Sequence, residues 1–498
     1  MMCASKIASQ LKETVTKEDT IHLWVLFIIL LLGIVIRLIF LFQPMRYDEA
    51  FSFIHFASKP LSLGLSDYSF PNNHLFHTFL VHLAYSTLGN QPWIIRLPAV
   101  LAGIFLVPAS YIATRIFYHK DAALLTAGLV ASSSILIEYS TNARGYTLIC
   151  LIFLVELTFG AFLMQRVDLS PWVLFSAISA TGFYTIPIML YPFGIVIVWL
   201  FLTILFEKSE RDRAVLLQRL GISIAITALL ALLLYLPVFL SSGLTAIIGN
   251  RFVRPRAWAE FFSQFPGSLL SIWQQWNRDI PFAISLFLVF GFFASLLFHR
   301  RVCAYRVPVV AAALLWVLPV ITIQRVIPFE RVWLFFLPLY LGLASAGLSY
   351  LFGASRFSAR SIVFMMGILV LTIWLGLSVV GSRSVYYSNE TGTLRDAEAI
   401  TIFLKGYLKS GDRVIAAVPS DAPLVYYFNL HEIPLKYFTG DLVSNKRIMV
   451  VINESYHQTL KWFLDRIKRE EVGFNTPEVI LRYESATLYQ IVRPDGKR

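Results

Sequence analysis

The stretch Leu23–Phe42, "LWVLFIILLLGIVIRLIFLF", decides the fold, because about twenty nearly uncharged residues follow one another in it. A helix rises about 1.5 Å per residue, so a run of this length crosses the hydrocarbon core of a bilayer. Directly after it, "QPMRYDEAFSF" (residues 43–53) puts two adjacent carboxylates, Asp48 and Glu49, at the exit of the helix. These carboxylates are either ordinary water-facing charges or part of a site at the membrane surface.

The composition of the whole chain indicates an integral membrane protein with many spans. Of its 498 residues, 57% are hydrophobic and 14% are charged, and the mean hydropathy is +0.68, which is rare in a soluble protein. The net charge of +12 lies mostly in short loops between apolar runs, so it sets membrane orientation and no nucleic-acid partner is expected. The three cysteines are scattered and indicate neither a disulfide framework nor a metal site.

About eleven apolar runs are candidates for membrane spans. They lie at 22–43, 94–117, 122–138, 144–165, 171–187, 188–206, 220–240, 281–298, 307–324, 332–352 and 361–381. No cleavage site follows the first run, which is typical of a retained signal anchor. Basic residues recur in alternate loops, and the positive-inside rule then places the N-terminal segment 1–21, with its three lysines, in the cytoplasm.

The same topology places the long first loop, 44–93, and the tail outside the cytoplasm. In the loop, "NHLFHTFLVHLAYSTLG" predicts an interfacial amphipathic helix. In the tail, "GDRVIAAVPSDAPLVYYFNL" predicts strand, turn and helix, "KRIMVVIN" a strand, "SYHQTLKWFLDRIKR" a helix, and "PEVILRYESATLYQIVR" two closing strands. The expected fold class is a polytopic α-helical membrane protein, with a transmembrane domain at 22–382 and a small extracytoplasmic α/β domain at 383–498.

Three arginines stand at the outer ends of expected spans, where the positive-inside rule disfavours them. They are Arg96 in "PWIIRLPAV", Arg144 in "EYSTNARGYTL" and Arg331 in "VIPFERVWLFF". Each could be a snorkelling side chain or half of a structural ion pair, for example with Glu138 or Glu330. Together with the carboxylate pair, they also fit recognition of a phosphate by guanidinium groups beside a carboxylate that acts as a base.

A sugar carried on a polyprenyl phosphate satisfies these features. Its lipid tail explains an embedded enzyme, and an inverting displacement needs one base for the acceptor hydroxyl and positive charge at the leaving phosphate. His74 in "FPNNHLF" faces the same compartment and is a further candidate, whereas helical spacing alone explains His77 and His82. A divalent metal held by Asp48, Glu49 and His74 is possible by ligand type, but no specific spacing supports it.

Five segments in this order, "DEA", "PNNHLFHTFL", "RLPAVLAGIFLVPASYIATRIF", "NARGYTL" and "ERVWLFFLPLYL", resemble the GT-C glycosyltransferases. The nearest branch contains the bacterial relatives of the protein O-mannosyltransferases and of the lipid A aminoarabinose transferase. The resemblance covers about residues 22–350 and is clearest from 44 to 165. It implies a multi-helix membrane enzyme whose first external loop lies over a donor cavity.

The resemblance also implies roles for individual residues. The catalytic carboxylate falls on Asp48, with Glu49 beside it. The candidate contacts to the donor phosphate are Arg144, Arg331 and Arg96, and the candidate substrate contacts are Tyr47, Asn73, His74 and Tyr146. Some relatives carry a His-Pro-Pro stretch or a lysine where this chain has "NNHLF", which leaves the sugar and the use of a metal open. The tail does not resemble a β-trefoil, so a protein acceptor gains no support from it.

The leading hypothesis is a glycosyltransferase of the bacterial inner (plasma) membrane that moves a sugar from a polyprenyl-phosphate donor to an extracytoplasmic lipid, polysaccharide or protein. A flippase or transporter of lipid-linked glycans is the alternative from another class, and it would show ionisable residues near helix centres and two related halves. A ligase or polymerase of surface polysaccharide is the third reading. A membrane scaffold with an external binding domain is the fourth.

Overall fold

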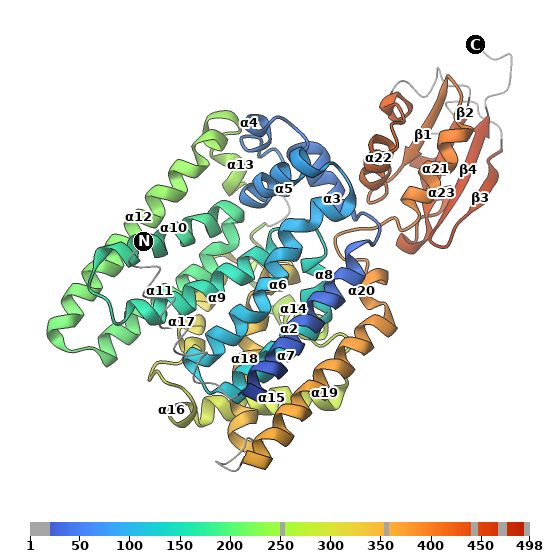
Figure 1. Ribbon diagram of the computed structural model, residues 1–498. Coiled ribbons are helices and arrows are strands. Elements are labelled where there is room, and N and C mark those ends of the chain that lie inside the picture. The colour runs from blue at the N-terminus through green and yellow to red at the C-terminus, as the bar shows by residue number, and fades with distance from the viewer. Residues whose placement is uncertain (1–19, 250–253, 353–357, 440–446, 467–475, 493–498) are drawn as a thin grey trace. The chain divides into compact units, whose positions relative to one another are not determined.

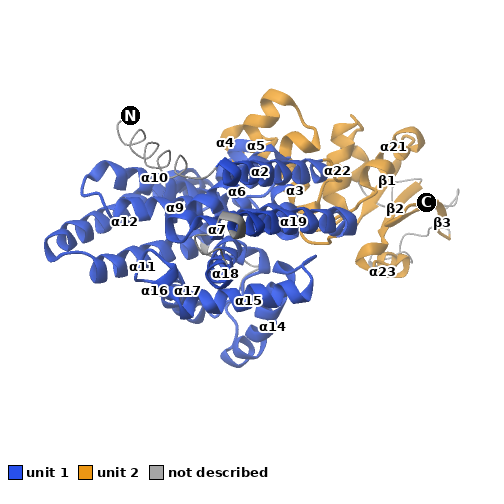
Figure 2. Ribbon diagram, turned by 60° about the horizontal axis from the view of Figure 1, so that its bottom comes forward, with its two compact units in different colours: residues 1–41, 65–80, 96–387 blue, residues 42–64, 81–95, 388–498 orange. Residues whose placement is uncertain are grey.

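The computed structural model describes residues 20–249, 254–352, 358–439, 447–466 and 476–492 (Figure 1). Of the expected cytoplasmic segment 1–21, all but the last two residues lie outside this range. The chain forms two compact units (Figure 2). Unit 1 comprises Met1–Leu41, Leu65–Leu80 and Arg96–Tyr387, and unit 2 comprises Phe42–Gly64, Val81–Ile95 and Ser388–Arg498.

The described part of unit 1 is helical. Its helices are α2 (Thr20–Leu41), α6 (Pro92–Phe117, from Arg96 onward), α7 (Lys120–Ser132), α8 (Ser134–Ser140), α9 (Tyr146–Leu163), α10 (Leu169–Thr185), α11 (Leu190–Glu207), α12 (Glu210–Ser241), α13 (Thr245–Ile248), α14 (Trp258–Trp276), α15 (Phe282–Leu297), α16 (His299–Val302), α17 (Val309–Gln324), α18 (Phe336–Phe352), α19 (Ser358–Ser382) and α20 (Ser384–Tyr387). Two 3₁₀ turns, η2 (Pro187–Met189) and η3 (Glu330–Trp333), join longer helices, and α5 (Leu75–Leu88) begins in this unit.

These helices make the protein a multi-pass membrane protein. Within the described residues, six helices are long and apolar enough to cross a bilayer, or seven if α7 and α8 form one span. The other four expected runs coincide with α10, α15, α17 and α18, which have 16 or 17 residues each. Large apolar side chains such as Trp24, Phe105, Leu229 and Phe290 point outward and are more than half exposed. Such a surface is stable against lipid and not against water.

The expected span 122–138 is not one continuous helix, which corrects the sequence prediction. It bends by 61° between α7 and α8, at Ser133, whose backbone is extended. The break leaves carbonyl groups at the end of α7 without helical partners. The fully buried Arg37 of α2 compensates, because its Nη1 donates to the carbonyl of Ala131 at 3.3 Å and its Nη2 to that of Val130 at 3.5 Å.

Unit 2 contains the α/β fold expected for the tail. Its strands are β1 (Asp412–Ala416), β2 (Arg447–Asn453), β3 (Glu478–Arg482) and β4 (Ala486–Val492), in the order β1-β2-β4-β3 (Figure 1). Strand β2 pairs parallel with β1 and antiparallel with β4, and its buried run of Ile, Met and Val side chains suits an inner strand of the sheet. The accompanying helices are α21 (Ala397–Tyr407), α22 (Asp421–Leu430) and α23 (Leu460–Arg466).

Unit 2 also contains the segment that follows the first span. This segment forms α3 (Tyr47–Ser52), the π-helical turn η1 (Phe53–Ala57) and α4 (Leu61–Gly64). The amide of Tyr47 donates to the carbonyl of Gly392 at 2.9 Å, and the amide of Asp48 donates to that of Thr391 at 3.0 Å. The backbone at 391–393 therefore fixes the start of α3.

Candidate functional site

His74 lies at the centre of a polar cluster in unit 1 that residues 144–146 complete. The amide of Gly145 donates to Nδ1 of His74 at 2.9 Å, and Nη2 of Arg144 lies 3.1 Å from Nε2 of the same ring. Nη1 of Arg144 donates to the carbonyl of Asn72 at 2.8 Å. His74 and Arg144 are 3% and 2% exposed, so this geometry is held inside the protein.

Gly145 is required by this close approach. A Cβ atom at position 145 would lie 2.7 Å from Cγ2 of Thr185 and 3.1 Å from Nδ1 of His74. Both distances are shorter than an ordinary van der Waals contact, so a larger residue would displace the imidazole or the chain. The segment "ARGY" thus carries a charge at Arg144, a space-saving residue at Gly145 and a ring at Tyr146.

The contacts define the protonation of His74. Burial, followed by the charges of Arg144, His77 and Arg331, holds the pKa of His74 well below its usual value. The ring is therefore neutral at neutral pH, and because Nδ1 accepts the Gly145 amide, the ring proton is on Nε2. The Nε2–H group and Nη2 of Arg144 are then two donors 3.1 Å apart, which cannot hydrogen-bond to each other and which a shared acceptor, such as an anion, would satisfy.

Tyr146 connects this cluster to Arg331. Its ring contacts the His74 ring edge-to-face, with 5.1 Å between centroids, and its hydroxyl accepts a hydrogen bond from Nε of Arg331 at 3.0 Å. Arg331 is half-buried in η3, and its guanidinium lies over the Phe329 ring at 4.5 Å. The structure thus brings together Arg144, Arg331, Tyr146 and His74, which the sequence places as far apart as 257 positions (331 − 74).

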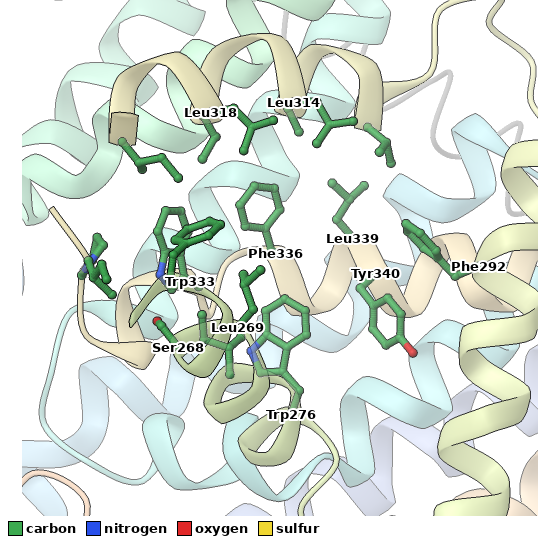
Figure 3. A pocket seen from close by; sticks show the side chains of 18 of the residues that line it. Ser268, Leu269, Trp276, Phe292, Leu314, Leu318, Trp333, Phe336, Leu339 and Tyr340 are labelled. Atoms are coloured by element: carbon green, nitrogen blue, oxygen red, sulfur yellow. The ribbon is translucent and has the colours of Figure 1, made fainter. Parts of the chain in front are cut away.

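A largely apolar cavity lies beside η3. It has a volume of about 290 Å³ and lies among α14, α15, α17 and α18, and Trp333 of η3 is part of its wall. Figure 3 shows Leu314 and Leu318 on one side, Leu269 and Trp276 on the other, with Phe336 between them. No sequence motif marked this cavity, because its lining comes from five separate segments.

Two other predicted contacts make hydrogen bonds that shape the fold. Arg96 is fully buried, and its Nη1 donates to the carbonyl of Leu41, the last residue of α2, at 2.7 Å. Asn73 donates from Nδ2 to the carbonyl of Asp67 and accepts from Oγ1 of Thr78, both at 2.7 Å. Arg96 therefore caps a helix, and Asn73 shapes the loop that presents His74.

The predicted catalytic pair lies in unit 2, in the first turn of α3. The carboxylate of Glu49 accepts from the amide of Arg46 at 2.8 Å and completes a capping box, which is a structural role. Asp48 is 8% exposed, and Tyr47 beside it is half-buried. Burial, then the charges of Asp421 and Asp48, raises the pKa of Tyr47 to about 12, so its phenol stays protonated and can donate a hydrogen bond.

Glu138 forms an ion pair, the kind of structural role that the sequence left open for it. Glu138 is buried and pairs with Arg278, which follows α14. In the part of the chain that the structure describes, no three His, Cys, Asp or Glu side chains are grouped to hold a metal ion.

Comparison with solved structures identifies the fold. The chain is similar to ArnT from Cupriavidus metallidurans in the apo state, with 13% identity, 95% of this chain and 98% of that chain covered, and a TM-score of 0.57. The same enzyme bound to undecaprenyl phosphate matches with 13% identity, 93% and 97% coverage, and a TM-score of 0.56.

A third similar structure is the archaeal oligosaccharyltransferase AglB from Archaeoglobus fulgidus, in complex with an inhibitory peptide and a dolichol-phosphate. It matches with 13% identity, 88% of this chain and 70% of that chain covered, and a TM-score of 0.54. The chain therefore shares the fold of these polytopic membrane proteins. No protein-family model matches the chain, and no curated protein sequence matches it either.

Proposed function

We propose that this protein is a membrane glycosyltransferase that moves a sugar from a polyprenyl-phosphate donor to an extracytoplasmic acceptor. The observation that carries the proposal is the cluster of Arg144, His74, Tyr146 and Arg331 next to an apolar cavity in the same unit. The cluster supplies donors for a phosphate, and the cavity accepts a lipid chain. The ligands of the similar structures, undecaprenyl phosphate and dolichol-phosphate, have this combination of groups.

The proposed reaction is an inverting displacement. The acceptor hydroxyl attacks the anomeric carbon, the bond between that carbon and the phosphate oxygen breaks, and polyprenyl phosphate leaves with the electron pair. Asp48 takes the hydroxyl proton, while the guanidinium groups of Arg144 and Arg331 and the Nε2–H of His74 stabilise the phosphate charge. Glu49 is not given a chemical role, because its carboxylate caps α3.

We place the reaction at the outer face of the bacterial inner membrane, with the N-terminus in the cytoplasm. The basic loops between spans support this orientation through the positive-inside rule. The proposal thus names the class of donor, a polyprenyl-phosphate sugar, and the identity of the sugar is to be found by experiment.

The test is transfer by the purified full chain in nanodiscs, supplied with undecaprenyl-phosphate arabinose, mannose, glucose and galactose in turn. Asp48→Asn keeps the shape of the side chain and removes the base, so it should lower transfer by at least about 100-fold without lowering the thermal unfolding temperature. Glu478→Gln, an exposed carboxylate on β3, is the matched control and should keep wild-type transfer. Equal transfer by wild type and Asp48→Asn would remove Asp48 from the mechanism.

A flippase of lipid-linked glycans stays as a second candidate because of one observation. Glu156 lies near the middle of α9, is fully buried, and accepts a hydrogen bond from Oγ of Ser179 at 2.5 Å. An ionisable side chain at that depth is typical of transport pathways. Movement of a fluorescent polyprenyl-phosphate glycan across proteoliposomes, lost in Glu156→Gln, would favour this candidate over the transferase.

A further inference from the structure

Three aromatic side chains form a row along α3 and η1 in unit 2. Tyr47, Phe51 and His55 are four positions apart, which places them on one helical face. The Tyr47 and Phe51 ring centroids are 5.8 Å apart, and the Phe51 and His55 rings stack at 3.9 Å with 19° between their planes. The first two side chains are half-buried and His55 is exposed, so the row is rigid and still accessible from solvent.

The C-terminal α/β fold supplies a carboxylate next to this row. Asp421 is the first residue of α22, which packs against α3. A Cβ atom at Gly392, where φ is +76°, would lie 2.7 Å from Cβ of both Tyr47 and Pro419, so the loop before Asp421 is held against Tyr47. Besides burial, the charge of Asp421 raises the pKa of Tyr47, and the charge of His55 opposes the effect of burial on the pKa of Asp421, so the carboxylate is near both ends of the row.

One oxygen of this carboxylate lacks a protein partner. Oδ1 of Asp421 is buried and makes no hydrogen bond to any residue that the structure describes. Burial raises the pKa of the Asp421 carboxyl, as expected for an acceptor removed from water. The residue as a whole is only partly buried, so the carboxylate is an acceptor that a ligand hydroxyl can approach at its exposed part.

We propose that the row of Tyr47, Phe51 and His55, together with Asp421, binds the sugar moiety of a carbohydrate acceptor. This inference rests on the proposed glycosyltransferase function and names the acceptor class of that reaction. A pyranose has an apolar C–H face that packs on aromatic rings, and hydroxyl groups at its edge that donate to a carboxylate. An acyl chain has no hydroxyl group to donate to the Asp421 carboxylate, and a Ser or Thr side chain has no flat apolar face to cover the row.

Saturation-transfer NMR on the full chain in nanodiscs tests the binding directly. The probes are methyl α-mannoside, methyl β-glucoside and methyl α-galactoside, with a Gly-Ser-Gly tripeptide for comparison. Saturation should pass from aromatic protons to the C–H groups of at least one glycoside, and should fall at least about fivefold in Phe51→Leu and in Asp421→Asn. Phe51→Leu keeps apolar bulk and removes the ring, Asp421→Asn keeps the side-chain shape, and Glu478→Gln is the matched control with unchanged saturation.

The proposal is overturned if no glycoside is saturated, if both variants keep wild-type saturation while folded by thermal unfolding, or if the tripeptide alone is saturated. Where transfer is also measured, the two variants should raise the KM for an octyl glycoside acceptor by about tenfold and change the donor KM far less. Glycoside binding without any donor turnover would refute the proposed transferase function and leave this sugar site standing. Donor turnover without glycoside binding would support the transferase function and overturn the sugar site.

Discussion

The proposed role of His74 is to donate a hydrogen bond from Nε2 to the phosphate. Two amide substitutions test it, because each imitates a different ring nitrogen. Asn places its polar atoms near the Nδ1 position, where its Oδ1 can accept the Gly145 amide, and has nothing at Nε2. Gln places an amide nitrogen near Nε2 and has no acceptor at Nδ1. His74→Asn should therefore keep the stability of the fold and lose the hydrogen bond to phosphate. His74→Gln should keep that hydrogen bond and lower the stability of the fold.

The magnitudes follow from the hydrogen bonds in the cluster. A hydrogen bond to a charged phosphate contributes about 1.5–3 kcal/mol, so His74→Asn should weaken binding of undecaprenyl phosphate by about 10-fold to about 150-fold. In the native protein the buried Gly145 amide lies 2.9 Å from Nδ1 of His74. His74→Gln removes this acceptor and should lower the free energy of unfolding by about 1–3 kcal/mol. The loss of binding in His74→Gln should be the smaller of the two.

The assay is calorimetric titration of the full chain in nanodiscs with undecaprenyl phosphate, next to thermal unfolding of each variant. Because burial and the nearby arginines hold the pKa of His74 well below its usual value, wild-type affinity should change little through any titration of this ring between pH 8 and pH 6. Wild-type affinity in His74→Asn would refute the donor role. Equal losses in both variants would show that ring shape, and not the Nε2 proton, matters.

Three further predictions concern the packing of unit 1. Gly145→Ala adds a Cβ 2.7 Å from Cγ2 of Thr185, so it should cost about 1–3 kcal/mol of stability in thermal unfolding and weaken undecaprenyl phosphate binding by displacing His74. Arg37→Met leaves the carbonyls at the α7–α8 break without a donor and should cost about 3 kcal/mol in the same assay. Burial, then the charge of Arg144, lowers the pKa of His77 to about 3, below its ordinary value of about 6.5, so the unfolded chain binds more protons than the native one in acid. Stability should then fall as the pH drops below about 6.5, by about 2 kcal/mol at pH 5 from this residue, and His77→Leu should remove that part of the loss.

The outcomes that contradict these three predictions are specific. A Gly145→Ala protein with wild-type stability and affinity would mean that the chain moves aside at no cost. Arg37→Met without a loss would mean that other groups satisfy the α7–α8 break, and Arg37→Lys, which keeps the charge, is the control for it. An unchanged acid profile in His77→Leu would assign the pH dependence to other groups.

The class of protein, the positions of its apolar runs and the α/β elements of its tail could be predicted from the sequence. Hydrocarbon demands about twenty apolar residues per span, so composition along the chain is enough to find them. The same reasoning missed the break at Ser133, because a bend in a buried helix depends on an outside donor, here Arg37 from another helix. The four shorter helices likewise show that an apolar run fixes a helix but not its exact length.

Among the candidate site residues, the sequence by itself determined the residue types: a carboxylate pair after the first span, a histidine in the following loop, and arginines at helix ends. Only the tertiary structure decided their roles. It made Glu49 and Arg96 caps, put Arg144, Gly145 and Tyr146 around His74, and brought Arg331 to Tyr146 across 185 positions. The physical reason is that hydropathy is a property of each segment alone, whereas a hydrogen bond belongs to two groups whose distance is set by the packing of the whole helical unit.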